Sequence, residues 1–146
     1  MKKRILIFAL LLMGISYSYA DTTNSITAKA VTSLKRDFAN ARDVKWEEKA
    51  DYSIASFSLN NEVMFAYYKN DGELIAVARN ILSDKLPIAQ LLSLKKDYKD
   101  CWITDLFEVS SDGNTYYYAS VENADQKIVL KSSSNGWDIY SKKDKQ

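Results

Sequence analysis

The side chains in this sequence best suited to acid–base chemistry are carboxylates. Eight of them lie near predicted strand ends or turns: Glu47, Glu48, Asp51, Asp71, Glu73, Asp105, Glu108 and Asp112. A glycosidase holds two carboxylates roughly 5 to 10 Å apart across the scissile bond. Acidic residues at turns are normally solvated, so we expect none of the eight to be catalytic. A carboxylate enzyme remains the third of three hypotheses for this chain.

Histidine is absent from the sequence, and cysteine occurs once, as Cys101. The chain therefore lacks the commonest general base and the commonest transition-metal ligand. This excludes the serine hydrolase triad, thiolate–imidazole catalysis and the usual zinc sites. Four glycines are too few for a glycine-rich phosphate-binding loop. We expect no catalytic residue and no cofactor, and so a protein that is not an enzyme.

Two further features bear on metal binding and on disulfides. Asn70, Asp71 and Gly72 resemble a fragment of a calcium loop, but the alternating ligands and the distal glutamate of that motif are missing. An Asp-Gly hairpin turn explains these residues, and we predict no metal site. Cys101 has no partner for an internal disulfide, and we expect it to be a small buried apolar residue; the alternative is a redox role or an intermolecular disulfide.

The first twenty residues have the pattern of a secretory signal peptide. A basic start at Lys2 to Arg4 precedes the apolar run from Ile5 to Gly14, and Ser18 and Ala20 supply small residues before the predicted cleavage at Asp21. The alternative is a membrane anchor that is never cleaved. The apolar run is shorter than the roughly 20 residues that span a bilayer. We therefore expect a periplasmic or secreted protein with no membrane span after cleavage.

The predicted mature chain is a single domain at residues 21–146. The whole sequence has 20 basic and 19 acidic residues, and three of the basic ones lie in the predicted signal peptide. The mature chain therefore has 17 basic residues against 19 acidic ones, a net charge of −2. Nucleic-acid-binding domains normally present a basic face, so we expect no nucleic-acid partner.

The mature chain is predicted to contain two similar halves, at about 26–82 and 83–141. The segment Ser33 to Phe38 matches Ser93 to Tyr98 at an offset of 60 residues, with four identities. Each copy ends a helix-like stretch and precedes several strand-like runs.

In the first half, apolar residues at spacings of four predict a helix from Ile26 to Ala39 with one packed face, made of Ile26, Ala30, Leu34 and Phe38. The predicted strands are Val44 to Glu48, Tyr52 to Leu59, Val63 to Lys69 and Leu74 to Asn80. Asn60-Asn61 and Asp71-Gly72 favour hairpin turns between them.

In the second half, Ser83-Asp84 is a possible helix cap and Pro87 suits a first helical turn. The predicted packed face of this helix is Ile88, Leu91, Leu92 and Tyr98. The predicted strands are Trp102 to Val109, Thr115 to Glu122, Lys127 to Ser132 and Trp137 to Ser141. We expect the charged tail from Lys142 to Gln146 to fray in solvent. The predicted fold class is α+β, a tandem repeat of a helix plus a four-stranded antiparallel sheet.

Aromatic side chains are the candidates for a binding surface. The predicted mature chain keeps 15 of the 18 aromatic residues; many of them lie on predicted strands, and tyrosine is the commonest type. Tyrosine and tryptophan offer a large contact area and a polar tip, which suits protein or sugar recognition. Aromatic residues also favour strands for packing alone. The candidate binding residues are Trp46, Tyr52, Tyr67, Tyr68, Tyr116, Tyr118 and Trp137.

The chain resembles the PepSY-like family of periplasmic proteins, whose fold is similar to that of the beta-lactamase inhibitor protein. Phe38 to Trp46 fits a helix-to-strand pattern of that family, Asn70 to Ile75 fits its Asp-Gly hairpin, and Leu86-Pro87 followed by Tyr98 fits its second helix. The resemblance implies tandem helix-plus-sheet units and protein binding through a concave sheet surface. The disulfides of the inhibitor are impossible here, and no motif matches its binding loops.

Three functions are compatible with these observations. The first is an exported binding or inhibitory module whose partner is an envelope or secreted protein. The second is a module that binds glycan or a small ligand of the cell envelope through the same aromatic residues. The third is the carboxylate enzyme, which the missing histidine disfavours.

Overall fold

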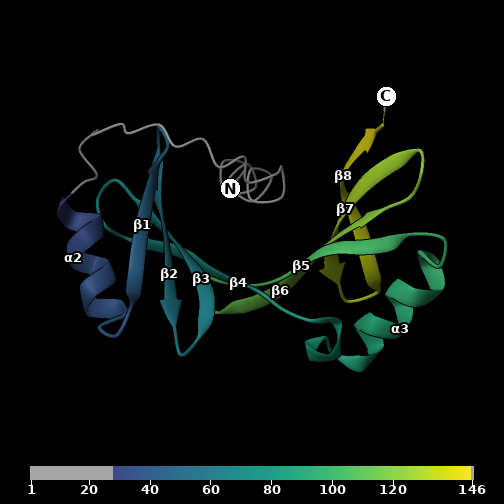
Figure 1. The fold of residues 1–146 in the computed structure, drawn as a ribbon, viewed down its shortest axis with the longest axis horizontal. Coiled ribbons are helices and arrows are strands. Elements are labelled where there is room, and N and C mark those ends of the chain that lie inside the picture. The colour runs from purple at the N-terminus through teal and green to yellow at the C-terminus, as the bar shows by residue number, and fades with distance from the viewer. Residues whose placement is uncertain (1–27, 146) are drawn as a thin grey trace. The chain divides into compact units, whose positions relative to one another are not determined.

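The computed structural model describes residues 28–145, which form an antiparallel sheet and two α-helices (Figure 1). The elements are α2 (Ala28–Asp37), β1 (Arg42–Glu48), β2 (Tyr52–Leu59), β3 (Glu62–Lys69), β4 (Leu74–Asn80), a 3₁₀ turn (Ser83–Lys85), α3 (Ile88–Asp97), β5 (Trp102–Ser111), β6 (Asn114–Glu122), β7 (Gln126–Ser133) and β8 (Gly136–Asp144). The predicted signal peptide and its cleavage site lie outside the described residues. Among the residues described, no helix is long and apolar enough to cross a membrane.

The described residues group into two compact units. The first unit contains residues 28–80 and 107–116, and the second contains residues 81–106 and 117–145. Strands β5 and β6 are long enough to contribute residues to both units. Each unit has its own helix and its own hydrophobic core.

The core of the first unit lies between α2 and the sheet. Ala30 and Leu34 of α2 are buried against Phe57 of β2 and Tyr68 of β3, as the four-residue apolar spacing predicts. Phe38 packs against the same cluster, with its ring centroid 4.9 Å from that of Phe57. Alternating residues of each strand face α2, so their neighbours in sequence face the other side of the sheet.

The core of the second unit lies under α3. Leu94 is buried there with Leu106, Val121 and Leu130 of the sheet. Pro87 occupies the N-cap position just before the first turn of α3 and makes no side-chain capping hydrogen bond. The segment with the predicted Ser83-Asp84 cap forms a 3₁₀ turn instead. Proline suits this place because it lacks the N–H that the start of a helix cannot use.

The two helices end in the same way. The amide of Phe38 donates to the carbonyl of Leu34, and the amide of Tyr98 donates to that of Leu94. Ala41 and Cys101 then donate to the carbonyls of Phe38 and Tyr98, each over 3.0 Å. The 60-residue offset read from the sequence therefore relates structurally equivalent turns.

The predicted tandem repeat of a helix plus a four-stranded sheet is wrong in one respect. All eight strands form a single antiparallel order from β1 to β8. Strand β4 pairs with β5, so that Val77 lies opposite Ser110 and Arg79 opposite Glu108. The side chain of Arg79 bonds Glu108 at 2.9 Å and Glu62 of β3 at 2.8 Å, which links three strands. The sequence did not predict this pairing, because a helical segment separates β4 from β5 along the chain.

Two local predictions also need correction. Ile88 and Leu92, assigned to the packed face of the second helix, are exposed, and Leu94 is buried in their place. The apolar residues of α3 extend around too much of the helix for periodicity to locate its buried side. The tail expected to fray instead extends β8 to Asp144, with Lys142 and Lys143 paired to β7.

The predicted hairpin turns are confirmed where the backbone needs a left-handed conformation. Asn60 and Asn61 have φ values of 52° and 66°, and Gly72 has a φ of 88°. Gly72 also lies against α2, because a Cβ there would come within 3.1 Å of the backbone of Lys29. Glycine at this turn therefore satisfies both the conformation and the packing of the first unit.

Candidate functional site

In the first unit, the predicted aromatic residues lie on both faces of the sheet. Trp46 and Tyr68 face α2, with ring centroids 6.1 Å apart, and the hydroxyl of Tyr68 donates to Asp37 over 3.3 Å. Burial and the negative charge of Asp37 raise the pKa of Tyr68. Tyr52 and Tyr67 are paired on the opposite face at 6.3 Å, and both are buried. Burial raises the pKa of Tyr67.

The remaining predicted aromatic residues lie on β6 and β8. Tyr116 is partly buried. Tyr118 is buried, with its ring centroid 5.6 Å from that of Tyr140 and the ammonium of Lys131 5.7 Å away. Trp137 packs against the core under α3, and its indole N–H donates to the backbone carbonyl of Gln90 over 3.0 Å.

The seven predicted residues therefore do not form one continuous face. The structure brings together Trp46 with Tyr68 and Tyr52 with Tyr67. Trp137 ties β8 to α3, which is a packing role. The binding role assigned to the seven residues stays a prediction.

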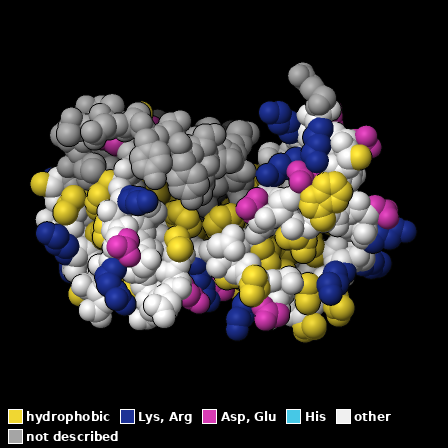
Figure 2. Space-filling view, viewed as in Figure 1, with side chains coloured by type: hydrophobic (Ala, Val, Ile, Leu, Met, Phe, Trp, Pro, Cys, Tyr) yellow, Lys and Arg dark blue, Asp and Glu magenta, His cyan; other side chains and the backbone are white. Residues whose placement is uncertain are grey.

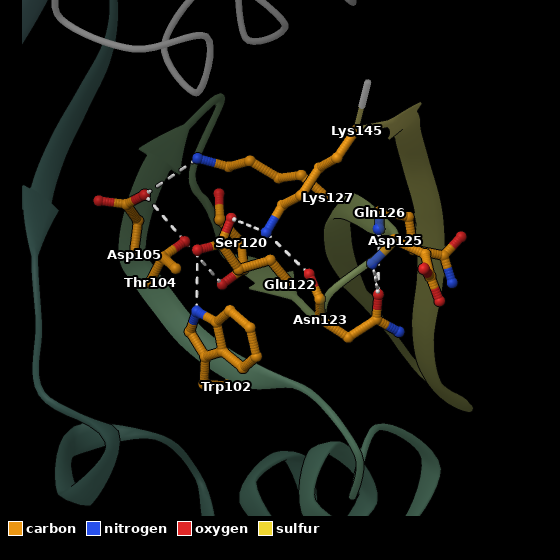
Figure 3. Close-up of polar contacts among 10 residues, drawn as sticks. All are labelled: Trp102, Thr104, Asp105, Ser120, Glu122, Asn123, Asp125, Gln126, Lys127 and Lys145. Atoms are coloured by element: carbon orange, nitrogen blue, oxygen red, sulfur yellow. Dashed lines mark hydrogen bonds and ion pairs between the residues drawn. The ribbon is translucent and has the colours of Figure 1, made fainter.

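The second unit contains a different group of side chains that combines an exposed aromatic ring with fixed charges (Figure 3). We call it the Trp102 cluster, and it consists of Trp102, Asp105, Glu122, Lys127 and Lys145. The indole N–H of Trp102 donates to Oε1 of Glu122 over 2.8 Å. The ammonium of Lys145 lies 3.3 Å from Oε2 of Glu122 and 5.1 Å from the centroid of the Trp102 ring. The Trp102 ring, which remains 52% exposed, is thus held by two partners.

The elements around the Trp102 cluster explain its position. Glu122 ends β6 and lies opposite Lys127 of β7, on the face away from α3, because the intervening Val121 is in the core. Lys127 forms an ion pair with Asp105 of β5, with 3.8 Å between Nζ and Oδ2. Lys145 follows the end of β8. Four strand ends therefore meet at this cluster.

The loop between β6 and β7 is fixed beside the cluster. Oδ1 of Asn123 accepts hydrogen bonds from the amides of Asp125 and Gln126, at 2.9 and 3.0 Å. The ammonium group of Lys145 donates a hydrogen bond to the backbone carbonyl of Asn123 over 2.7 Å. The backbone amide of Lys145 donates to the backbone carbonyl of Asp125, also over 2.7 Å. These bonds hold the loop and Lys145 in one arrangement.

The charges of the cluster favour an ionised Glu122. The hydrogen bond from Trp102 lowers the pKa of Glu122, and the ammonium groups of Lys145 and Lys127 lower it further, against the opposing effect of burial. A carboxylate with a lowered pKa is a poor general acid at neutral pH. The cluster thus combines an ionised carboxylate, two ammonium groups and an exposed aromatic ring.

The other acidic groups of residues 28–145 form no metal site. The structure there contains no group of three or more cysteine, aspartate or glutamate residues that could hold a metal ion. Glu47 and Glu73 form ion pairs with Lys49 and Lys69, and Glu108 pairs with Arg79. A hollow lined by Ala39 to Arg42 and Asn60 brings together no set of acid–base groups.

The comparisons with known proteins identify the fold alone. A BLIP-like protein from Bacteroides fragilis superposes with a TM-score of 0.66 at 21% identity, covering 80% of this chain and 84% of that one. The chain has a BLIP-like fold. A DUF2874 family protein from Bacteroides ovatus shares the BLIP-like fold of this chain, with a TM-score of 0.72, 14% identity and coverage of 83% and 89%.

A third protein of the same fold, from Bacteroides eggerthii, is provisionally described as periplasmic. Its TM-score is 0.71 at 15% identity, covering 80% of this chain and 87% of that one. No protein-family model matches this chain, and no curated protein matches it. The resemblance to the PepSY-like family therefore stays a prediction beside the BLIP-like fold.

The sequence does not predict the Trp102 cluster. It places Trp102 only at the start of a strand and offers Asp105 only as a possible acid. Lys145 was assigned to a frayed tail, so its contacts with Glu122 and Asn123 could not be foreseen. The available signal was Trp102 itself, whose counterpart at the 60-residue offset is Arg42.

Proposed function

We propose that this chain is an exported, non-enzymatic binding module that contacts another protein through the Trp102 cluster. The partner is a protein of the cell envelope or a secreted protein. Where that partner is an enzyme, binding at this cluster would inhibit it by covering its surface.

The observation that carries this proposal is the half-exposed but immobilised ring of Trp102. Tryptophan is enriched among residues that dominate protein interfaces. Its indole N–H bonds Glu122, and Lys145 lies over its ring. A side chain that is already ordered loses less conformational entropy when a partner covers it.

Two further observations support the proposal. The BLIP-like protein from Bacteroides fragilis has the same fold, which favours a binding module but does not specify a target. The protein from Bacteroides eggerthii is described as periplasmic, which agrees with the signal peptide predicted at residues 1–20 and with export of this chain.

Site-specific photo-crosslinking in the cell of origin tests the proposed contact. A photoreactive amino acid replaces Trp102 in the full chain, and crosslinked products are identified by mass spectrometry. The matched control places it at Ile139, which is 59% exposed and lies opposite Leu130, a core residue under α3. Because residues directly opposite on neighbouring strands share a face, Ile139 is turned away from Glu122.

The expected result is one protein crosslinked from position 102 and not from position 139. Equal crosslinking from both positions, or none from position 102, would contradict the proposed interface. A product containing glycan in place of protein would support the second function, because a tryptophan face beside carboxylate and amide groups also suits sugars.

A further inference from the structure

The outward surface of α3 carries large aliphatic side chains that the fold does not use. Ile88 is 70% exposed and Leu92 is 60% exposed, and they are one helical turn apart. Leu82, just before the 3₁₀ turn, is 71% exposed. Leu94 of the same helix is buried and contributes to the core. We call Leu82, Ile88 and Leu92 the aliphatic patch.

Helix α2 shows that such a patch is not required by this arrangement of helix and sheet. At the 60-residue offset, Ile88 corresponds to Ala28 and Leu92 to Thr32, both exposed. The core position is the same in the two helices, with Leu34 matching Leu94. The aliphatic patch is therefore an addition in the second unit that packing does not explain.

Exposed lysines lie on α3 and in the adjoining segments, and Figure 2 shows basic and acidic side chains beside the hydrophobic ones at the lower right. Lys95 and Lys96 lie one turn beyond Leu92 and are exposed, and Lys85 and Lys99 are exposed in the adjoining segments. Among the acidic neighbours, Asp97 accepts a hydrogen bond from the hydroxyl of Ser93. Asp84 and Asp100 lie in the adjoining turns, which leaves four lysines against three aspartates.

We propose that the aliphatic patch and its lysines dock this protein on an anionic lipid surface. Aliphatic residues on a helix bordered by lysines insert at the boundary between headgroups and acyl chains, and each lysine near an anionic surface adds electrostatic attraction.

The composition of the aliphatic patch favours lipid over a protein partner or a second copy. Residues that dominate protein interfaces are enriched in tryptophan, tyrosine and arginine, and leucine is under-represented. The patch has none of the enriched types. Three side chains also fall well short of the roughly 800 Å² per partner that a stable dimer buries. A lipid surface requires only apolar bulk and positive charge.

Vesicle binding tests this proposal with protein purified after export from cells expressing the full chain. Mass spectrometry of its N-terminus first establishes that residues 1–20 have been removed, so that they cannot insert into the vesicles. Sedimentation then compares vesicles of phosphatidylcholine alone with vesicles containing about one third phosphatidylglycerol. The variant I88A/L92T replaces Ile88 and Leu92 by the residue types that α2 has at the equivalent positions. The variant I139A is the control, because it truncates another exposed aliphatic residue.

We expect binding to the anionic vesicles, at least tenfold weaker partitioning for I88A/L92T, and unchanged partitioning for I139A. The variant K95Q/K96Q should also bind more weakly, because charge attraction is lost. Absence of vesicle binding, or equal binding by I88A/L92T, would overturn the proposal. Self-association of the wild type that I88A/L92T abolishes, without vesicle binding, would assign the patch to contacts between copies instead.

Discussion

Helices α2 and α3 have the same core anchor but different outer surfaces. Leu34 and Leu94 occupy equivalent buried positions, and each is followed by two basic residues and an aspartate. Outside, α2 presents Ala28 and Thr32 where α3 presents Ile88 and Leu92. Packing therefore fixes the leucine that the two helices share, and the outer positions are free to differ.

The sheet differs between the two units in a similar way. In the first unit, the face away from α2 carries two aromatic pairs, Phe65 with Phe107 at 6.2 Å and Tyr52 with Tyr67 at 6.3 Å, and all four residues but the partly buried Phe65 are buried. In the second unit, the face away from α3 carries the aromatic pair Tyr118 and Tyr140 and, at the strand ends, the charged residues of the Trp102 cluster. Similar backbones thus support different surfaces, and function is best sought where the units differ.

Truncating the shared core anchor should have the largest effect. Leu34→Ala and Leu94→Ala each remove a buried side chain and leave a cavity, which destabilises proteins by about 2–5 kcal/mol. Urea unfolding of each variant would measure the loss. A loss below about 1 kcal/mol for one variant alone would show that the two helices are not equivalent anchors.

Replacing hairpin glycines should give a smaller and graded effect. Gly72→Ala combines a strained φ of 88° with a clash at 3.1 Å with the backbone of Lys29. Gly113→Ala imposes only the φ of 76°, because a Cβ there meets no atom within 4 Å. We expect the free energy of unfolding to fall by about 1 kcal/mol for Gly113→Ala and by more for Gly72→Ala. Thermal unfolding of both variants would measure this. The reverse order would contradict the close contact of this turn with α2.

The pH dependence of the Trp102 cluster should distinguish the second unit from the first. The pKa of Glu122 is held below its ordinary value of 4.5, so its carboxylate stabilises the folded state at neutral pH. That contribution is lost as the pH falls through the lowered pKa. The indole N–H resonance of Trp102, identified with a Trp102→Phe variant, should therefore titrate with a midpoint below 4.5.

The variant Glu122→Gln serves as the control, because it keeps an oxygen acceptor but has no ionisable group. In this variant the same resonance should not titrate in the acid range. A wild-type midpoint at or above 4.5 would show that Trp102 and Lys145 do not favour the ionised carboxylate.

Exchanging the outer helix residues should have the smallest effect on stability. Leu92→Thr and Thr32→Leu alter exposed side chains, and such substitutions usually change the free energy of unfolding by less than about 0.5 kcal/mol. Chemical denaturation of both variants would test this. A loss above about 1 kcal/mol for Leu92→Thr would mean that Leu92 contributes to packing after all.

Much of the fold could be predicted from the sequence, because its signals are local. Strands β2 and β4 have the predicted bounds, and the turns at Asn60 and Gly72 follow from residues that tolerate positive φ. The pairing of β4 with β5 was missed because it joins segments separated by a helix.

The candidate site could not be predicted, because its contacts are not local. Trp102, Glu122 and Lys145 come from three separate strand ends, and no spacing in the sequence brings them together. The exposure of Ile88 and Leu92 was likewise hidden, because apolar residues extend around much of α3. Such features depend on which side of an element the rest of the chain covers.

The affinity of the crosslinked partner for the Trp102 cluster tests the central claim most directly. Isothermal titration would compare the purified partner with the wild type, Trp102→Ala and Ile139→Ala. A dominant interface residue contributes 2 kcal/mol or more, which is roughly a 30-fold loss of affinity. We predict at least this loss for Trp102→Ala and no change for Ile139→Ala. Equal affinities for the wild type and Trp102→Ala would contradict the account.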